Sequence, residues 1–101
     1  MSRRLIISPQ AEADLEEIGD HIAQDSPRQA IRIVSALREK CALISAQPFL
    51  YPLSEETAAG FRRALVTPYG IWFQVLDNGD IRVERIVHGS RDLPSLFEAK
   101  G

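Results

Sequence analysis

The residues with the most evident chemistry lie near the end of the chain, within residues 83–92. Arg85, His88 and Arg91 recur there at steps of three, where a run of β-forming residues ends. Guanidinium groups hold phosphates and carboxylates through paired hydrogen bonds. An imidazole titrates near neutral pH and can act as a general acid or base. This set therefore predicts an anion-holding surface with one titratable group.

Two further arginines, Arg62 and Arg63, lie on another predicted strand and could extend this surface. The aromatic residues Tyr69, Trp72 and Phe73 follow them closely. Aromatic rings beside arginines can stack on bases, but in a small sheet they more often fill the core or an interface. The sequence therefore indicates a basic surface, and it favours the core or an interface for the aromatic rings while leaving a binding role open.

The competing interpretation of these residues is an ordinary surface network. Arg85 could pair with Glu84, and Arg91 could pair with Asp92, with little energetic consequence. His88 would then be satisfied by a backbone carbonyl. The residue types leave both interpretations open.

Other chemistries find little support in the chain. The two histidines, His21 and His88, lack the spacing of a metal-binding helix, and a lone Cys41 excludes a disulfide framework and a cysteine-built zinc site. Cys41 falls in an apolar stripe, so we interpret it as a core residue. The absence of a glycine-rich phosphate loop leaves no cofactor and no metal to expect. The acidic residues of the first helix are interpreted as a solvated face: Glu12, Glu16, Glu17 and Asp20.

The composition bounds the function further. The chain has 101 residues, 45% hydrophobic and 26% charged, which predicts a single globular domain over residues 1–101. A net charge of −2 argues against direct nucleic-acid binding, although residues 61–91 hold five arginines against three acidic residues. No apolar run approaches the length of a membrane span, and the start lacks the apolar core of a signal peptide. We therefore expect a cytoplasmic protein.

Two helices are predicted in the first half. Ser8-Pro9 and Ser26-Pro27 each combine a favoured N-cap with a proline at the first helical position. Apolar residues then recur at steps of three and four, and Pro48 ends the second helix. A short linker makes the pair an antiparallel hairpin. The two apolar stripes are Ala11, Leu15, Ile18 and Ile22, then Ala30, Val34, Leu37, Cys41 and Ile44.

Strands are predicted at residues 5–7, 61–66, 71–76 and 81–87. Asn78-Gly79 joins the last two, and this pair favours a type I′ hairpin turn. The irregular connection over residues 48–60 is expected to be pinned to the core by Phe49 and Leu53. A last helical turn is expected at residues 92–98. The alternation over residues 81–88 leaves open whether one strand face is mixed or a β-bulge resets it.

These elements predict an α+β fold of order β-α-α-β-β-β. An N-terminal strand and a two-helix antiparallel hairpin pack on a small, mostly antiparallel, curved sheet. The arginines would then lie on a surface that binds another macromolecule.

The order and spacing of these features resemble the RelE/ParE superfamily of bacterial type II toxins, specifically its ParE-like branch. The resemblance covers nearly the whole chain, and its most specific part is the last. The matching residues are Ser8-Pro9-Gln10-Ala11, Asp14-Leu15, Ile18, Ala30, Leu37, Phe61-Arg62, the 71–75 strand, and Arg85-Ile86-Val87-His88-Gly89 followed by Arg91-Asp92.

The resemblance implies a toxin of a toxin–antitoxin system, neutralised by a cognate ParD-like antitoxin and associated with plasmid stabilisation. ParE-like members inhibit DNA gyrase by protein binding, whereas RelE-like members cut messenger RNA in the ribosome. The residues that would bind the target or the antitoxin are Arg62, Arg63, Tyr69, Arg85, His88 and Arg91.

The two branches differ in the catalytic groups that they need. In-line RNA cleavage requires a base, an acid and charge stabilisation around the phosphate. Only His88, Arg85 and Arg91 remain for those roles, because Phe73 stands where many relatives carry a tyrosine. We therefore favour a non-catalytic gyrase inhibitor, and keep the ribosome-dependent mRNA endonuclease as the alternative. A repurposed family member that only binds a partner ranks third.

Overall fold

The computed structural model describes residues 4–54 and 60–89, so Arg91 and the helical turn expected at residues 92–98 lie outside the described residues. The described elements follow the predicted order, with a short 3-10 helix after the second α-helix. They are β1 (Leu5–Ile7), α1 (Pro9–Ala23), α2 (Pro27–Ala46), η1 (Pro48–Leu50), β2 (Arg62–Val66), β3 (Tyr69–Val75) and β4 (Ile81–His88). The β-α-α-β-β-β prediction is confirmed.

Both helices begin where the serine–proline pairs predict. The Ser8 side chain accepts a hydrogen bond from the backbone N–H of Ala11 at 3.0 Å, and Ser26 accepts one from Gln29 at 3.1 Å. Each bond satisfies a backbone donor that the first helical turn would otherwise leave without a partner. The capping residues therefore set the first residue of each helix.

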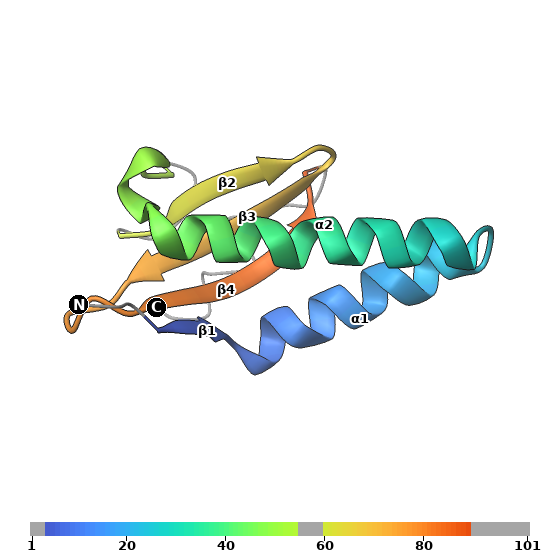
Figure 1. The fold of residues 1–101 in the computed structure, drawn as a ribbon, viewed down its shortest axis with the longest axis horizontal. Helices are drawn as coiled ribbons and strands as arrows, with labels where there is room; N and C mark the ends of the chain where they lie inside the picture. The colour runs from blue at the N-terminus through green and yellow to red at the C-terminus, as the bar shows by residue number, and fades with distance from the viewer. Residues whose placement is uncertain (1–3, 55–59, 90–101) are drawn as a thin grey trace.

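The two helices form an antiparallel hairpin that covers one face of the sheet, and the turn of the hairpin extends past the end of the sheet (Figure 1). Seven of the nine residues in their predicted apolar stripes meet the sheet in one core, whereas Ile22 and Ala30 do not belong to it. Its fully buried members are Ala11, Leu15, Leu37, Cys41, Ile44, Ala64, Ile71, Phe73, Ile81, Val83 and Ile86. None of the helices within residues 4–54 and 60–89 is long and apolar enough to cross a membrane.

The sheet has the strand order β1-β4-β3-β2. β1 runs parallel to β4, while the β4–β3 and β3–β2 pairs are antiparallel. β1 is short, and its last pair joins Ile7 to Val83. The far half of β4 therefore lies beyond the reach of β1, and another element must cover that edge.

A β-bulge resolves the alternation problem in β4. Trp72 pairs with Arg85 and Phe73 pairs with Val83, so Glu84 is the extra residue. Val83 and Ile86 consequently both face the helices although they are three residues apart. Of the two possibilities that the sequence left open, the bulge is confirmed.

The hairpin between β3 and β4 is confirmed, but its predicted turn type is wrong. Gly79 has a φ of 93°, whereas no non-glycine residue in the described part of the chain has a positive φ. A type I′ turn needs positive φ at both central positions. Instead, Leu76 pairs with Asp80 around a three-residue loop, closed by a 2.8 Å bond from the N–H of Gly79 to the carbonyl of Leu76. One glycine suffices for this geometry.

The expectation that Phe49 and Leu53 anchor the connection after α2 is wrong. Phe49 is 61% exposed and Leu53 is 57% exposed. Pro48 is buried instead, and the Tyr51 ring packs edge-on against Phe73 with 5.9 Å between the ring centroids. The neighbours of the expected anchors therefore hold this segment to the core.

The second face of the sheet carries a smaller buried cluster of Phe61, Trp72 and Val87. Trp72 is only 1% exposed, and its indole lies over Gly70. A Cβ atom at position 70 would come within 2.4 Å of the indole Cη2 and Cζ3 atoms. Gly70 is therefore required by the packing of Trp72.

We predict that Gly70→Ala lowers the free energy of unfolding by about 1–3 kcal/mol, because the added methyl group overpacks a buried indole. Chemical denaturation checks the loss. The double variant Gly70→Ala/Trp72→Leu should cost less than the sum of the two single variants, because the smaller side chain makes room for the methyl group. An unchanged denaturation midpoint for Gly70→Ala would contradict this packing.

Candidate functional site

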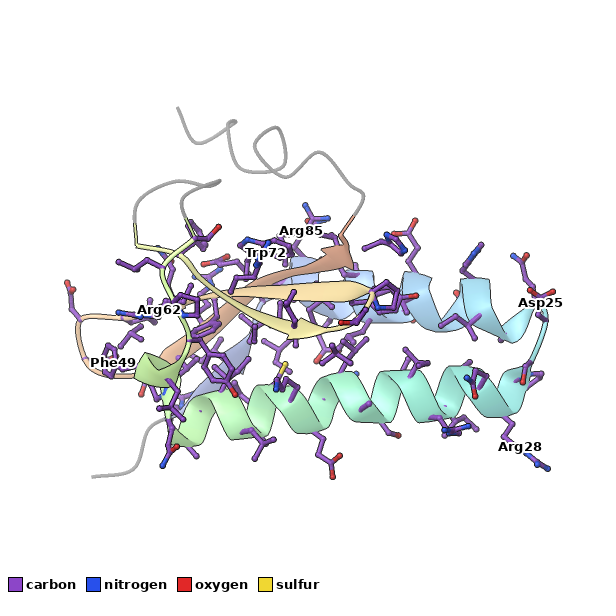
Figure 2. The ribbon with its side chains drawn as sticks, turned by 90° about the horizontal axis from the view of Figure 1, so that it is seen from above. Asp25, Arg28, Phe49, Arg62, Trp72 and Arg85 are labelled. Carbon is purple, nitrogen blue, oxygen red and sulfur yellow. The ribbon has the colours of Figure 1, made fainter. Side chains whose placement is uncertain are left out.

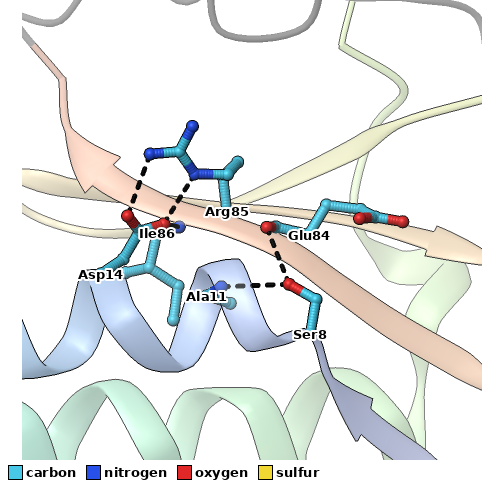
Figure 3. A network of polar contacts seen from close by, with 6 residues as sticks. All are labelled: Ser8, Ala11, Asp14, Glu84, Arg85 and Ile86. Atoms are coloured by element: carbon cyan, nitrogen blue, oxygen red, sulfur yellow. Dashed lines mark hydrogen bonds and ion pairs between the residues drawn. The ribbon is translucent and has the colours of Figure 1, made fainter. Parts of the chain in front are cut away.

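The site begins with an ion pair between α1 and the bulged end of β4 (Figure 3). Arg85 donates from Nε and Nη2 to the two carboxylate oxygens of Asp14, at 2.8 and 2.9 Å. The same carboxylate accepts a 2.9 Å hydrogen bond from the backbone N–H of Ile86. Hydrogen bonding to Asp14 raises the pKa of Arg85 above its ordinary value. Asp14 thus holds a side chain and a backbone group of one strand together.

Ser8 adds a second contact between α1 and β4, at Glu84, the residue before Arg85. Its hydroxyl donates to the carbonyl of Glu84 at 3.0 Å while it caps α1 through Ala11 (Figure 3). Glu84 and Ile86 follow the last residue of β4 that pairs with β1. Beyond the end of β1, the side chains of Ser8 and Asp14 therefore form hydrogen bonds with backbone groups of β4. A longer β1 would otherwise have paired with these groups.

The surface network expected for Arg85 differs from the observed one. Glu84 pairs with Arg82 at 3.2 Å, whereas Arg85 pairs with Asp14. The Asp14 and Arg85 side chains are 6% and 14% exposed. The Arg85–Glu84 pairing is therefore wrong, and the suggested Arg91–Asp92 pair lies outside the described residues. A buried carboxylate compensates the charge of Arg85, which weakens its capacity to hold a second anion.

The candidate arginines of β2 are separated by the alternation of the strand. Arg62 lies opposite the core residue Phe73, and Arg63 lies opposite Trp72. The Arg63 guanidinium stands 5.9 Å from the centroid of the Trp72 ring. Since Trp72 also lies opposite Arg85, the structure gathers Arg63, Trp72 and Arg85 on the face away from α2. Figure 2 shows Trp72 and Arg85 together there.

Arg62 belongs to a different part of the molecule. Its Nη1 atom donates to the carbonyl of Tyr51 at 2.7 Å, and its guanidinium stands 4.9 Å from the centroid of the Phe49 ring. Figure 2 shows Arg62 and Phe49 at the end of the molecule that carries η1. Arg62 therefore does not join the group of Arg63, Trp72 and Arg85.

The histidine and tyrosine candidates meet on the helix-covered side of the sheet. Tyr69 and His88 are paired across β3 and β4, and their rings make an edge-to-face contact with 5.7 Å between centroids. They line a cavity of about 260 Å³ with Glu17 and His21 of α1. Its other lining residues are Asp14, Ile18, Ile86 and Val87. The two histidines, which the sequence placed on unrelated elements, thus share one cavity.

This cavity is a partly apolar recess lined by histidine, tyrosine and carboxylate side chains. Within residues 4–54 and 60–89, no group of three histidine, cysteine or acidic residues is arranged to hold a metal ion. His88 and Arg85 point to opposite faces of β4 after the bulge, and Asp14 is the residue that touches both neighbourhoods. The site can bind a side chain through its rings and carboxylates more readily than it can surround a phosphate.

Cys41 is a core residue, as its position in the α2 stripe predicts. Its side chain is fully buried, and burial raises the pKa of the thiol to about 11. A thiol with this pKa is almost entirely protonated near neutral pH, so it lacks the thiolate that nucleophilic attack needs. The sequence interpretation is confirmed for this residue.

Asp14 is the important residue that the sequence interpretation missed. It lies three residues after Ala11 and four before Ile18, so it falls on the apolar face of α1. A charged residue inside an apolar stripe is rarely buried without a partner. That position was the available signal, although nothing local identifies Arg85 as the partner.

Comparisons with known proteins agree with this architecture. Residues 5–93 match the family model described as ParE toxin of type II toxin-antitoxin system, parDE. Toxin ParE1 of Mycobacterium tuberculosis, from strains CDC 1551 and H37Rv, is 29% identical over 97 residues, which cover 92% of this chain and 96% of that protein.

Two solved structures share the fold. The chromosomal ParDE toxin–antitoxin system from P. aeruginosa superposes with a TM-score of 0.73 and 25% identity, covering 85% of this chain and 95% of that one. The toxin–antitoxin complex RelBE2 from Mycobacterium tuberculosis gives a TM-score of 0.65 and 22% identity, covering 87% and 99%. The predicted RelE/ParE-like fold is confirmed.

We predict that Asp14→Ala lowers the free energy of unfolding by about 3 kcal/mol, because it leaves the Arg85 charge and the Ile86 N–H without the carboxylate that pairs with them. Chemical denaturation provides the measurement. The matched control is Glu12→Ala, which removes an exposed carboxylate of the same helix that pairs with Arg38 at 2.9 Å. The control should cost less than about 1 kcal/mol. Equal costs for the two variants would show that Asp14 does not join the layers as described.

Proposed function

Because the chain belongs to the family of ParE toxins of type II toxin–antitoxin systems, we propose that it inhibits DNA gyrase by protein binding and is held inactive by a cognate ParD-like antitoxin. The family match over residues 5–93 is the observation that carries this proposal. Both activities take place in the cytoplasm, and the role that follows is growth control or plasmid stabilisation by a single toxin domain.

The geometry of the arginines supports binding over catalysis. Phosphoryl transfer requires preorganised positive charge around the phosphate. Asp14 already compensates Arg85, Arg62 is directed to Tyr51 and Phe49, and His88 lies on the face opposite to Arg85. The candidate groups are thus distributed over a broad surface, which suits the recognition of a protein better than the enclosure of one phosphate.

The proposed binding residues fall into two groups around β3 and β4. Arg63 and Arg85 flank Trp72 on the open face, whereas Tyr69 and His88 line the cavity beside α1. Arg62 lies apart from both groups, and Arg91, outside the described residues, completes the proposed set. An acidic segment of a partner would pair with the guanidinium groups, since complementary charge steers and orients association.

A segment that orders only on the toxin would also explain release. A free antitoxin segment that lacks a packed core is open to proteolysis, and its ordering cost is met only on binding. Degradation of the antitoxin would then leave a preformed toxin surface exposed. Regulation therefore needs no conformational change in the toxin.

We predict that the purified chain inhibits DNA supercoiling by gyrase at micromolar concentration and that the antitoxin encoded by the adjacent reading frame reverses the inhibition. Arg63→Glu should weaken inhibition about tenfold or more, because it reverses a charge on the open face. Arg32→Glu on α2 is the matched control and should inhibit normally. Full supercoiling activity at micromolar toxin would overturn the gyrase proposal, and normal growth on induction without antitoxin would favour a family member that only binds a partner.

A ribosome-dependent mRNA endonuclease is the second candidate, favoured by the cavity that brings His21, Tyr69 and His88 together. Under this function His88 acts as the general acid or base, so His88→Gln should slow mRNA cleavage by about 10²–10⁴-fold. Primer extension on messenger RNA from induced cells measures the cuts. Intact transcripts in growth-arrested cells would remove this candidate.

A further inference from the structure

An exposed apolar patch lies where the chain leaves α2. Phe49 is 61% exposed, Leu50 is 73% exposed and Leu53 is 57% exposed. We define these three residues together with Arg62 as the η1 patch. Single exposed apolar residues are ordinary, but three within five positions on one short segment make this segment a candidate interaction surface.

The η1 patch has a hollow and a firm base. A cavity of about 360 Å³ is lined by Ala46, Gln47, Pro48, Phe49 and Leu50. Pro48 is buried, and Tyr51 packs against Phe73 in the core. The N–H of Leu50 donates to the carbonyl of Gln47 at 3.2 Å, which closes the turn. A surface held in one conformation before binding loses little entropy when a partner arrives.

Two cationic side chains stand beside the aromatic rings of this segment. The Arg62 guanidinium stands over the Phe49 ring, and Lys40 Nζ stands 5.5 Å from the centroid of the Tyr51 ring. The ion pairs among the described residues involve neither Arg62 nor Lys40. Arg62 is also fixed by its 2.7 Å bond to the Tyr51 carbonyl. A largely apolar hollow, one of whose lining residues, Phe49, carries a fixed guanidinium over its ring, matches an apolar segment that carries a carboxylate.

We propose that the η1 patch is a docking site for an amphipathic, acidic segment of the antitoxin, a proposal that rests on the function proposed above. Apolar side chains of that segment fill the hollow beside Phe49 and Leu50, and a carboxylate meets Arg62. A second copy of this chain fits less well, because a two-fold contact would bring Arg62 and Lys40 of both copies together. This surface is separate from the cavity of Tyr69 and His88.

The test measures the affinity of the purified antitoxin from the adjacent reading frame for variants of the full toxin chain, by titration calorimetry. Leu50→Glu should weaken binding about tenfold or more, because it places a charge in the hollow and repels the acidic segment. Ile31→Glu is the matched control, since Ile31 is an apolar residue of α2 that is 69% exposed and lies outside the η1 patch. The control should bind like the unmodified chain.

Two further measurements make the result decisive. Leu50→Ala, which removes apolar surface without adding charge, should weaken binding in the same direction, and it replaces Leu50→Glu if that variant loses its thermal transition. Arg62→Gln should flatten the salt dependence of the affinity, because it removes the charge that pairs with the carboxylate.

The outcomes separate this inference from the function on which it rests. If the unmodified chain does not bind the antitoxin, the proposed function fails. If it binds, but Leu50→Glu and Leu50→Ala bind as tightly as Ile31→Glu, the docking site is wrong while the function stands. A concentration-dependent dimer that Leu50→Glu abolishes would assign the η1 patch to a second copy and overturn the inference.

Discussion

The carboxylate of Asp14 is the contact on which the arrangement of this protein depends. Because β1 is only three residues long, the second half of β4 needs hydrogen-bond partners that β1 cannot supply. Asp14 and Ser8 supply them from the start of α1, and Asp14 also holds Arg85. The first two turns of α1 therefore supply hydrogen bonds that a longer β1 would have supplied. The position of the helical hairpin on the sheet follows from this attachment.

The bulge at Glu84 makes that attachment compatible with a packed core. It lets Val83 and Ile86 both face the helices, while Val87 turns to the cluster around Trp72. It also directs Arg85 to the open face and His88 to the cavity beside α1. The sheet thus presents two different chemical surfaces in a chain of 101 residues: a basic open face and a cavity beside α1 that is lined by histidine and tyrosine.

The arginines acquire different roles from their positions. Arg85 pairs with Asp14, Arg63 stands over the Trp72 ring on the open face, and Arg62 belongs to the η1 patch. A toxin must meet an antitoxin and a target, and separate surfaces would let the two partners be recognised by different residues. The proposed gyrase contact uses Arg63 on the open face, whereas the inferred antitoxin segment uses the η1 patch.

The sequence alone determined the elements, because their signals are local. Ser8-Pro9 and Ser26-Pro27 set the helix starts, the apolar stripes set the buried faces, and Asn78-Gly79 located the hairpin. The tertiary structure decided the features that depend on residues far apart in the sequence. The partner of Asp14 lies 71 residues away, the bulge depends on the register with β3, and Phe49 is exposed because Pro48 and Tyr51 take the core positions. Capping and periodicity act over a few neighbouring residues, whereas register, charge pairing and burial are fixed only when distant segments compete for the same space and the same hydrogen bonds.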